Sequence, residues 1–193
     1  MRHLVHSLVL VGILAAAGTA LAQLDPELDS IGIYFDTEAT IHRIALLPGE
    51  HHAYLAITNP TDPSGVAGWE CRIDTAGPLF VLEWGVLGLA INANTPPSFT
   101  VGLADPLPFA NQMILMDMVF MLTGTEEASF FVKSIFNASL EGVPAYASGA
   151  DPSLLHELRQ STGGPDFPVA VINGEAPVAT EDATWGGVKN LYR

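Results

Sequence analysis

One pattern repeats through most of this chain: a short apolar or alternating run, followed by a cluster of Pro, Gly, Asn and Asp residues. Short runs separated by turn residues are typical of β-strands. The prolines in segments 59–65 and 94–97 prevent strand pairing there, because proline lacks an amide donor and restricts the residue before it. Strands are predicted near residues 31–36, 40–46, 52–58, 68–74, 79–84, 90, 98–103, 113–122 and 129–136.

These strands, with no long helices between them, predict an all-β fold. We expect an antiparallel two-sheet β-sandwich with a loop-rich C-terminal extension and one or two short helices. Alternation along segments 68–74 and 79–84 predicts one buried face on each strand. The residues predicted to be buried are Trp69, Cys71, Ile73, Phe80, Leu82 and Trp84, whereas Glu70, Arg72, Asp74, Val81 and Glu83 lie on the opposite faces.

The beginning of the chain has the features of a secretory signal peptide. Arg2 precedes the apolar run 8–17, and Ala20-Leu21-Ala22 offers the small residues that signal peptidase recognises. An apolar run of this length is too short to span a hydrocarbon core about 30 Å thick as a helix. We therefore expect cleavage near Ala22, a secreted or periplasmic product, and no transmembrane segment in the mature chain.

Three parts of the chain are predicted: a signal peptide at 1–22, a β-sandwich domain at 23–150, and a C-terminal extension at 151–193 that packs on the sandwich. The extension is rich in glycine and proline. Segment 151–158 predicts a short helix capped by Asp151, and segment 168–173 a further strand. The chain ends in a short amphipathic tail, in which Trp185, Val188 and Tyr192 have helical spacing.

The chain is strongly acidic, with 21 acidic and 7 basic residues and a net charge of −14. Nucleic-acid binding relies on Lys and Arg that displace counterions, so this charge argues against nucleic acid and against anionic membranes. An acidic surface attracts divalent cations or basic partners, and it also keeps an exported protein soluble. The single cysteine, Cys71, excludes an internal disulfide, and its place beside Trp69 predicts a buried, inert thiol.

Carboxylates near the N-terminus are the candidates for a metal site. Asp25, Glu27 and Asp29 stand at alternate positions, and Ca²⁺ prefers oxygen ligands. Their spacing differs from that of a twelve-residue calcium loop, and a solvated terminal segment also explains the cluster. No other cofactor is indicated. His51 and His52 face opposite ways on a strand and cannot chelate one ion together.

Two acidic residues are the candidates for hydrolysis. Asp36 and Glu38 would have Cβ atoms about 6–7 Å apart on an extended strand, which overlaps the carboxylate separations of glycosidases. Such pairs are common in an acidic chain. The sequence contains no Gly-x-Ser-x-Gly elbow, and Cys71 on a buried face is a poor nucleophile. We therefore assign no catalytic residue.

Three features are candidates for an interaction surface. Tyr54 and His52 share one face of their strand and form a small amphipathic strip. Met116 and Met118 lie in a methionine-rich run, 113–122, that is apolar on both faces. A central strand covered on both sides explains this run, and so does a recognition surface, because methionine adapts to varied partners. Trp185 is the third candidate.

Several segments resemble uncharacterised exported bacterial proteins with a cohesin-like or immunoglobulin-like β-sandwich. They read AYLAITNP at 53–60, GVAGWE at 65–70 and FTVGLA at 99–104, and the ending TWGGVKNLYR at 184–193 is similar to short Trp-Gly-x-x-Lys tails of such proteins. The resemblance implies a fold and an exported location, with no activity attached. The sequence holds no dockerin-type calcium loop, so a cellulosome role does not follow.

Together these observations favour a non-catalytic exported β-sandwich protein that serves in adhesion, assembly or binding at the cell envelope. Its partner would be another envelope or extracellular protein, or a glycan. A carbohydrate- or calcium-binding module is the alternative function, and an acid/base hydrolase acting on glycans is the second alternative.

Overall fold

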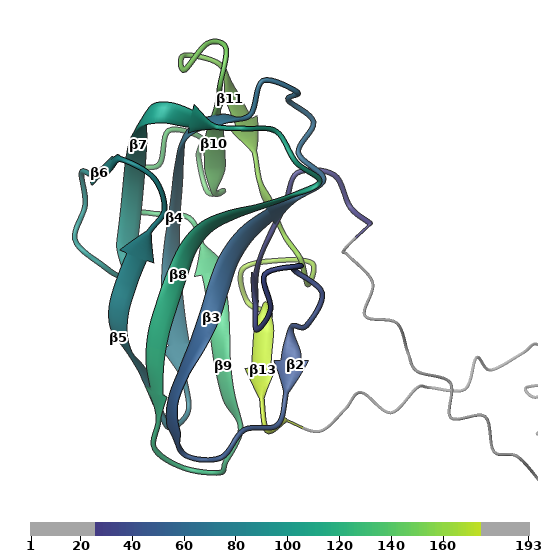
Figure 1. The fold of residues 1–193 in the computed structure, drawn as a ribbon, viewed down its shortest axis with the longest axis vertical. Helices are drawn as coiled ribbons and strands as arrows, with labels where there is room; N and C mark the ends of the chain where they lie inside the picture. Colours follow the sequence, from purple (N-terminus) through teal and green to yellow (C-terminus); the bar gives the residue numbers. More distant parts are fainter. Residues whose placement is uncertain (1–25, 175–193) are drawn as a thin grey trace, which may run out of the picture.

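The computed structural model describes residues 26–174, which fold into two β-sheets packed face to face (Figure 1). Within this part of the chain, no helix is long and apolar enough to cross a bilayer. The strands are β1 (Ser30–Tyr34), β2 (Arg43–Ile44), β3 (Gly49–Thr58), β4 (Val66–Ala76), β5 (Leu79–Val86), β6 (Ala90–Asn92), β7 (Ser98–Leu107), β8 (Gln112–Leu122), β9 (Ala128–Lys133), β10 (Ala145–Ser148), β11 (Leu155–Glu157), β12 (Arg159–Gln160) and β13 (Ala170–Ile172).

The five-stranded sheet has the order β12-β1-β3-β8-β5, and it lies in front of β4 and β9 in Figure 1. The eight-stranded sheet has the order β11-β10-β4-β9-β13-β2, with β7 paired to β4 and β6 paired to β7. Two short pairs at sheet edges, β1 with β12 and β13 with β2, are parallel, and the other pairs are antiparallel. The predicted two-sheet sandwich is confirmed, with these two parallel pairs added.

The inner faces of the two sheets meet in one hydrophobic core. Phe120 of β8 contacts Phe130 of β9 edge to face, with ring centroids 5.4 Å apart, so rings from opposite sheets interlock. Trp69 of β4 and Trp84 of β5 both pack on Phe99 of β7. Burying a large apolar side chain contributes about 2–3 kcal/mol. These contacts hold the sheets together in a chain that has no second cysteine for a disulfide.

The residues of β4 are buried as the sequence predicts: Trp69, Cys71 and Ile73 all lie in the core, and Cys71 is a free thiol. Its removal from water, with a smaller contribution from the charge of Glu70, raises the pKa of the Cys71 thiol far above its usual value. Because the thiolate is the reactive form, this thiol is inert while the protein is folded.

The predicted face of β5 is wrong for three residues, Phe80, Val81 and Leu82. Phe80 is 50% exposed and Leu82 is 48% exposed, whereas Trp84 packs against the core. The pairing of β5 with β8 shifts between Val81 and Glu83, which marks a β-bulge. The extra residue at the bulge reverses the alternation, so that Val81 points inward before it and Trp84 points inward after it.

The helix predicted for residues 151–158 is also wrong, because residues 155–157 form β11 and pair with β10. The segment before β11 is a tight turn in which the Asp151 carboxylate accepts hydrogen bonds from the backbone and hydroxyl of Ser153. Asp has this role in turns as readily as at helix N-termini. Strand pairing satisfies more of the backbone than an isolated eight-residue helix, which is marginal in water. The helical spacing around Trp185 lies outside the described residues.

The last two described strands, β12 and β13, lie in different sheets. β12 pairs with β1 in the five-stranded sheet, and β13 lies between β9 and β2 in the eight-stranded sheet. The strand predicted near residues 168–173 is therefore present as β13 and lies inside its sheet. Residues 155–172 complete the sandwich by supplying strands to it.

Candidate functional site

A groove of about 400 Å³ lies on the outer face of the eight-stranded sheet, across β7, β4 and β10. We call it the β4 groove. Its floor is formed by residues with little or no side chain, and Gly68 stands opposite both Gly102 and Ala147 in the strand register. The floor residues are Gly68 of β4, Gly102 of β7, and Ala145 and Ala147 of β10. Trp69 and Val101 next to them point into the core, so the small residues face outward.

The two glycines of the floor have different reasons for lacking a side chain. A Cβ atom on Gly68 would come within 2.6 Å of the carbonyl oxygen of Val101, a backbone atom that cannot easily move. A Cβ atom on Gly102 would meet no heavy atom of the described residues within 4 Å. The sheet therefore requires glycine at position 68, whereas position 102 is open space at the bottom of the groove.

The rim of the β4 groove is apolar and exposed. Ile91 of β6 forms one wall, and Pro152 and Leu155 of the β10–β11 hairpin line another part. Ile91 is 77% exposed, and Phe136 is 91% exposed beside an adjoining hollow that shares Glu70 with the groove. Large apolar side chains gathered on one face of a sheet are typical of an interaction surface.

Glu70 carries the one formal charge among the described residues that line the β4 groove. Its side chain faces away from the core, as the sequence predicts, but it is only 5% exposed. The backbone N–H of Ser139 donates to one carboxylate oxygen at 2.7 Å, and the Ser139 hydroxyl donates to the other at 3.0 Å. These two donors replace water around the carboxylate and fix it in place.

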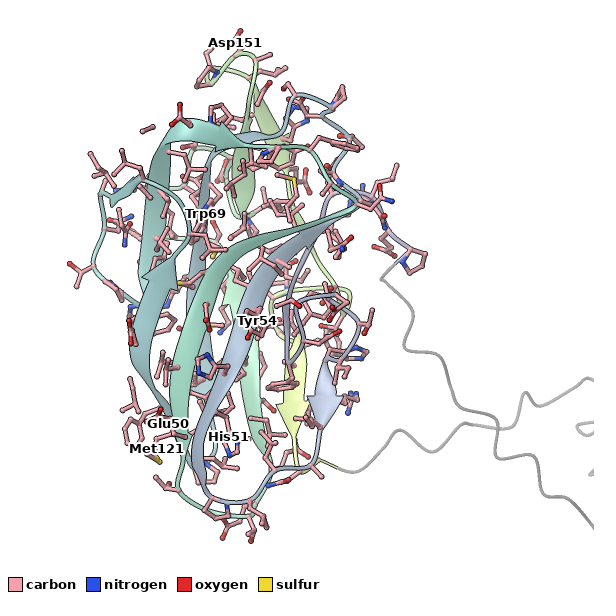
Figure 2. All side chains as sticks on the ribbon, viewed as in Figure 1. Glu50, His51, Tyr54, Trp69, Met121 and Asp151 are labelled. Atoms are coloured by element: carbon pink, nitrogen blue, oxygen red, sulfur yellow. The ribbon has the colours of Figure 1, made fainter. Side chains whose placement is uncertain are left out.

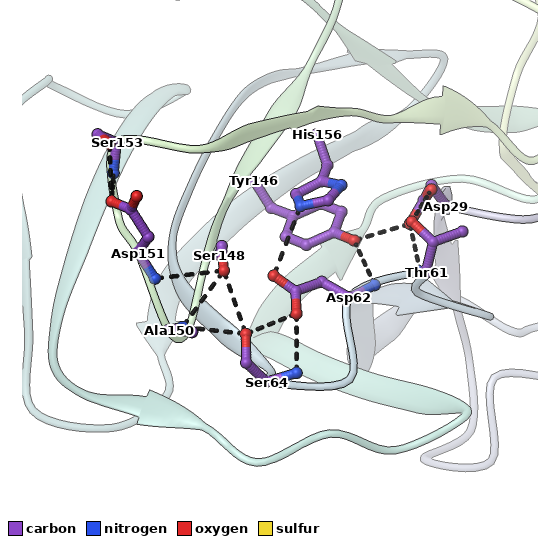
Figure 3. Close-up of polar contacts among 10 residues, drawn as sticks. All are labelled: Asp29, Thr61, Asp62, Ser64, Tyr146, Ser148, Ala150, Asp151, Ser153 and His156. Atoms are coloured by element: carbon purple, nitrogen blue, oxygen red, sulfur yellow. Dashed lines mark hydrogen bonds and ion pairs between the residues drawn. The ribbon is translucent and has the colours of Figure 1, made fainter.

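A cluster of polar side chains adjoins the groove through Tyr146 and connects the loop before β4 to β10 and β11 (Figure 3). Asp62 accepts hydrogen bonds from the backbone N–H of Ser64 at 2.8 Å and from its hydroxyl at 2.5 Å. His156 Nε2 lies 3.5 Å from the other Asp62 oxygen. Hydrogen bonds from the hydroxyls of Ser148 and Ser64 lower the pKa of Asp62 to about 2.

Tyr146 connects this cluster to the N-terminal part of the chain. Its hydroxyl donates to Asp29 at 2.8 Å and accepts a hydrogen bond from the Asp62 backbone N–H at 3.2 Å. Asp29 also accepts hydrogen bonds from the backbone and hydroxyl of Thr61, both at 2.7 Å. Burial is the main cause that raises the pKa of Tyr146 to about 12. The phenol therefore stays protonated and keeps donating its hydrogen bond.

The geometry of this cluster does not activate a nucleophile. Asp62 lies between His156 and Ser64, and it contacts both of them. In a serine hydrolase the histidine must lie between the serine and the aspartate, because it takes the proton from the serine hydroxyl. The arrangement fixes a loop and a hairpin relative to each other.

Of the three carboxylates considered for calcium, the structure describes Glu27 and Asp29. Asp25 lies outside the described residues, and Glu27 is exposed. Both oxygens of Asp29 accept hydrogen bonds from protein groups. Between residues 26 and 174, no group of three or more His, Cys, Asp or Glu side chains is placed to hold a metal ion.

Asp36, considered for hydrolysis, serves to close a turn. Its carboxylate accepts hydrogen bonds from the Thr40 hydroxyl at 2.6 Å and from the backbone N–H groups of Thr40 and Ile41 at 3.0 and 2.7 Å. Glu38 in the same turn is exposed. Neither carboxylate lines the β4 groove.

The residues predicted to form an interaction surface lie in three different places. Tyr54 and His52 lie on β3 on the outer face of the five-stranded sheet, where His52 Nδ1 lies 2.9 Å from Asp117 Oδ1. Figure 2 labels Tyr54 on this front strand and Trp69 on the strand behind it. Met116 and Met118 are fully buried, because β8 lies between β3 and β5 and these residues face the core, so an exposed surface cannot include them. Trp185 lies outside the described residues.

The β4 groove was missed by the sequence analysis. Gly68 and Gly102 stand at alternating positions of predicted strands, and this is the signal that could have revealed an outer face without side chains. Ala145 and Ala147 lie between predicted strands, in a segment for which the pattern predicts no strand. Only the pairing of β4 with both β7 and β10 brings the four residues together.

No protein-family model matches this chain, and no curated protein matches its sequence. One similar solved structure is the sixth cohesin of scaffoldin B from Acetivibrio cellulolyticus, in complex with a mutant dockerin. It superposes with a TM-score of 0.51 at 7% sequence identity, and the match covers 77% of this chain and 100% of that chain. A type II cohesin domain from the cellulosome of the same organism gives 0.48 at 13% identity, covering 76% and 96% of the two chains. A non-cellulosomal cohesin from the archaeon Archaeoglobus fulgidus gives 0.45 at 10% identity, covering 69% and 86%. The described part of this chain is a cohesin-like β-sandwich.

Proposed function

We propose that this protein is a non-catalytic binding module, and that a partner protein docks in the β4 groove. The observation that carries the proposal is the groove itself, a hollow floored by backbone and small side chains on a rigid sheet, with Ile91 and Phe136 exposed around it. An apolar anchor on a partner would find both a space to fill and apolar side chains to cover.

The charge of the protein specifies the partner further. The one formal charge among the described lining residues is Glu70, and the whole chain carries a net charge of −14. A partner that presents an apolar anchor flanked by Lys or Arg side chains is therefore complementary to this surface. The Acetivibrio cohesin with this fold was solved in complex with a dockerin, which supports the binding of one protein by another.

The place of action in this proposal is outside the cytoplasm, in assembly or adhesion at the cell envelope. The support comes from residues 1–22, which have the pattern of a secretory leader. The test is expression in a bacterium, followed by N-terminal sequencing of the protein from the periplasm and the medium. We expect an N-terminus at Gln23. A chain that stays in the cytoplasm and keeps Met1 would contradict export.

The docking proposal is tested with a phage-displayed library of random peptides, selected on the purified protein. Gly102→Trp fills the open space at the bottom of the groove, and Gly102→Ala is the matched control that leaves most of it free. A second pair of variants leaves the floor intact: Ile91→Glu changes the rim, and Leu47→Glu changes an equally exposed residue that does not line the groove.

We expect selected peptides to combine an aromatic or large aliphatic residue with neighbouring Lys or Arg. Their affinity should fall by about tenfold or more for Gly102→Trp and Ile91→Glu, and stay near the wild-type value for Gly102→Ala and Leu47→Glu. A library that yields no enriched peptide overturns the proposal. Peptides that bind all four variants equally also overturn it, because they bind elsewhere.

A further inference from the structure

A second hollow, of about 660 Å³, lies along the other half of β4. Residues 67–70 of this strand line the β4 groove, whereas residues 72–76 line the second hollow, which we call the Asp74 pocket. The pairing of β7 with β4 stops at Ser98 and Arg72. Beyond that point β4 faces the turn at Pro96 and Pro97 and strand β5 of the other sheet, and the pocket lies between them.

One side of the Asp74 pocket is an ion-paired group of three residues. Arg72 Nε donates to one oxygen of Asp74 at 2.7 Å, and Lys133 Nζ lies 3.1 Å from the other. Partial burial acts to raise the pKa of Asp74, but hydrogen bonds from Arg72 and Lys133 outweigh it and hold that pKa below its usual value. Asp166 also lines the pocket. The positive charges of Arg72 and Lys133 therefore balance the negative charges of the two aspartates in the lining.

The other side of the pocket is aromatic. Phe80 and Trp84 of β5 and Phe131 of β9 all line it. Phe80 is half exposed because of the bulge in β5, which turns its ring out of the core and toward the pocket. Lys133 Nζ lies 5.6 Å from the centre of the Phe131 ring, so the charged side of the pocket is adjacent to its aromatic side.

We propose that the Asp74 pocket binds a neutral sugar ring of a glycan. A sugar hydroxyl both donates and accepts hydrogen bonds, so it is matched by a lining that offers guanidinium and ammonium donors beside carboxylate acceptors. The C–H face of a pyranose is apolar and packs on aromatic rings, whose faces are electron-rich. The balanced charge of the lining and the net charge of −14 both disfavour an anionic ligand.

The size of the pocket agrees with this ligand class. Sites for small molecules typically occupy about 300–1,000 Å³ and combine apolar walls with a few fixed polar groups. Arg72 uses its Nε–H to hold Asp74, and guanidinium has five N–H donors in all, so donors remain for a ligand. The pocket shares no lining residue with the β4 groove, so the two sites can be tested separately.

The test uses a glycan array that carries neutral, uronate-containing and sulfated glycans, probed with the full-length protein, followed by calorimetry with the best-binding glycan. Phe80→Ala removes the aromatic wall. Leu82→Ala is the matched control, because Leu82 lies two residues away on the same strand with nearly the same exposure and does not line the pocket. Gly102→Trp, which fills the β4 groove, is measured in the same assays to distinguish glycan binding in the Asp74 pocket from glycan binding in the β4 groove.

We expect saturable binding to at least one neutral glycan, with affinity about tenfold lower for Phe80→Ala and unchanged for Leu82→Ala and Gly102→Trp. An array without neutral-glycan binding overturns the proposal, as does binding restricted to charged glycans. Equal losses for Phe80→Ala and Leu82→Ala also overturn it. Loss only in Gly102→Trp would place sugar binding in the β4 groove, which contradicts this proposal and the docking of a protein there.

Discussion

His156 stacks on Tyr146 with ring centroids 4.7 Å apart, and its Nε2 atom lies 3.5 Å from the carboxylate of Asp62. This contact joins β11 to β10 and both strands to the loop before β4. The hairpin formed by β10 and β11 carries Pro152 and Leu155, which line the β4 groove. The shape of the groove therefore depends on a polar cluster that a binding partner need not touch.

Replacing Asp62 should weaken the fold at this hairpin. In Asp62→Ala the part-buried backbone N–H and hydroxyl of Ser64 lose this acceptor, and a donor shielded from water without a partner is costly. We expect a lower urea midpoint by circular dichroism and faster hydrogen exchange in residues 145–157. Asp151→Ala is the control, because Asp151 is exposed at the tip of the same hairpin, labelled in Figure 2. Equal effects of the two changes would contradict a central role for Asp62.

The same carboxylate makes stability depend on acid. Its pKa is about 2 in the folded protein and 3.8 for the unperturbed group, so the folded state favours the ionised form. The resulting stabilisation is complete above the unfolded pKa and is lost as the pH falls through the interval toward the folded pKa. We expect the melting temperature to fall between pH 4 and pH 2, measured against Asp62→Asn, which should show a shallower fall. Parallel curves for the two proteins would show that other groups cause the acid sensitivity.

The two glycines of the groove floor should respond differently to alanine. Gly68→Ala forces a methyl group against the Val101 carbonyl, and overpacking of this kind costs about 1–3 kcal/mol. Gly102→Ala places its methyl group in open space, so its stability should equal or exceed that of the wild type. Urea unfolding of both variants gives the comparison. A destabilised Gly102→Ala protein would show that position 102 is more crowded than the structure indicates.

Cys71 should be protected as long as the sandwich is folded. The thiol is fully buried and its pKa is raised, so a thiol reagent such as DTNB should react with it only after unfolding in denaturant. The rate at low denaturant should follow the unfolding equilibrium measured by fluorescence. Reaction with the native protein at the rate of a free thiol would contradict the burial.

Cys71→Ser should destabilise the protein by about 1–3 kcal/mol in urea unfolding, because it buries a hydroxyl group that has no hydrogen-bond partner in the core.

Local sequence pattern was sufficient where the structure depends on neighbours along the chain. Alternation alone located Trp69, Cys71 and Ile73 in the core, because β4 is regular through these residues. It failed for Phe80 and Leu82, since the bulge in β5 arises from pairing with β8, a strand far away in sequence. The methionine-rich run fits both a core strand and a recognition surface, and the position of β8 between β3 and β5 places Met116 and Met118 in the core.

The candidate sites were harder to predict than the fold, because each one depends on pairing between distant segments. The β4 groove needs Gly68 beside both Gly102 and Ala147. Glu70 is exposed on any isolated strand, and its 5% exposure in the fold depends on neighbours distant in sequence, including Ser139, which donates hydrogen bonds to it. Asp151 illustrates the same limit, because Asp followed by Pro and Ser fits a helix start as well as the turn that precedes β11.

The pairing of β1 with β12 and of β2 with β13 has a consequence for the time at which the protein folds. β1 obtains its neighbour only when the chain as far as Gln160 has emerged, and β2 only when the chain as far as Ile172 has emerged. Topologies that join early and late segments form slowly. A chain cut short before Arg159 therefore leaves β1 and β2 without these partners, with their backbone groups open to pairing with other chains.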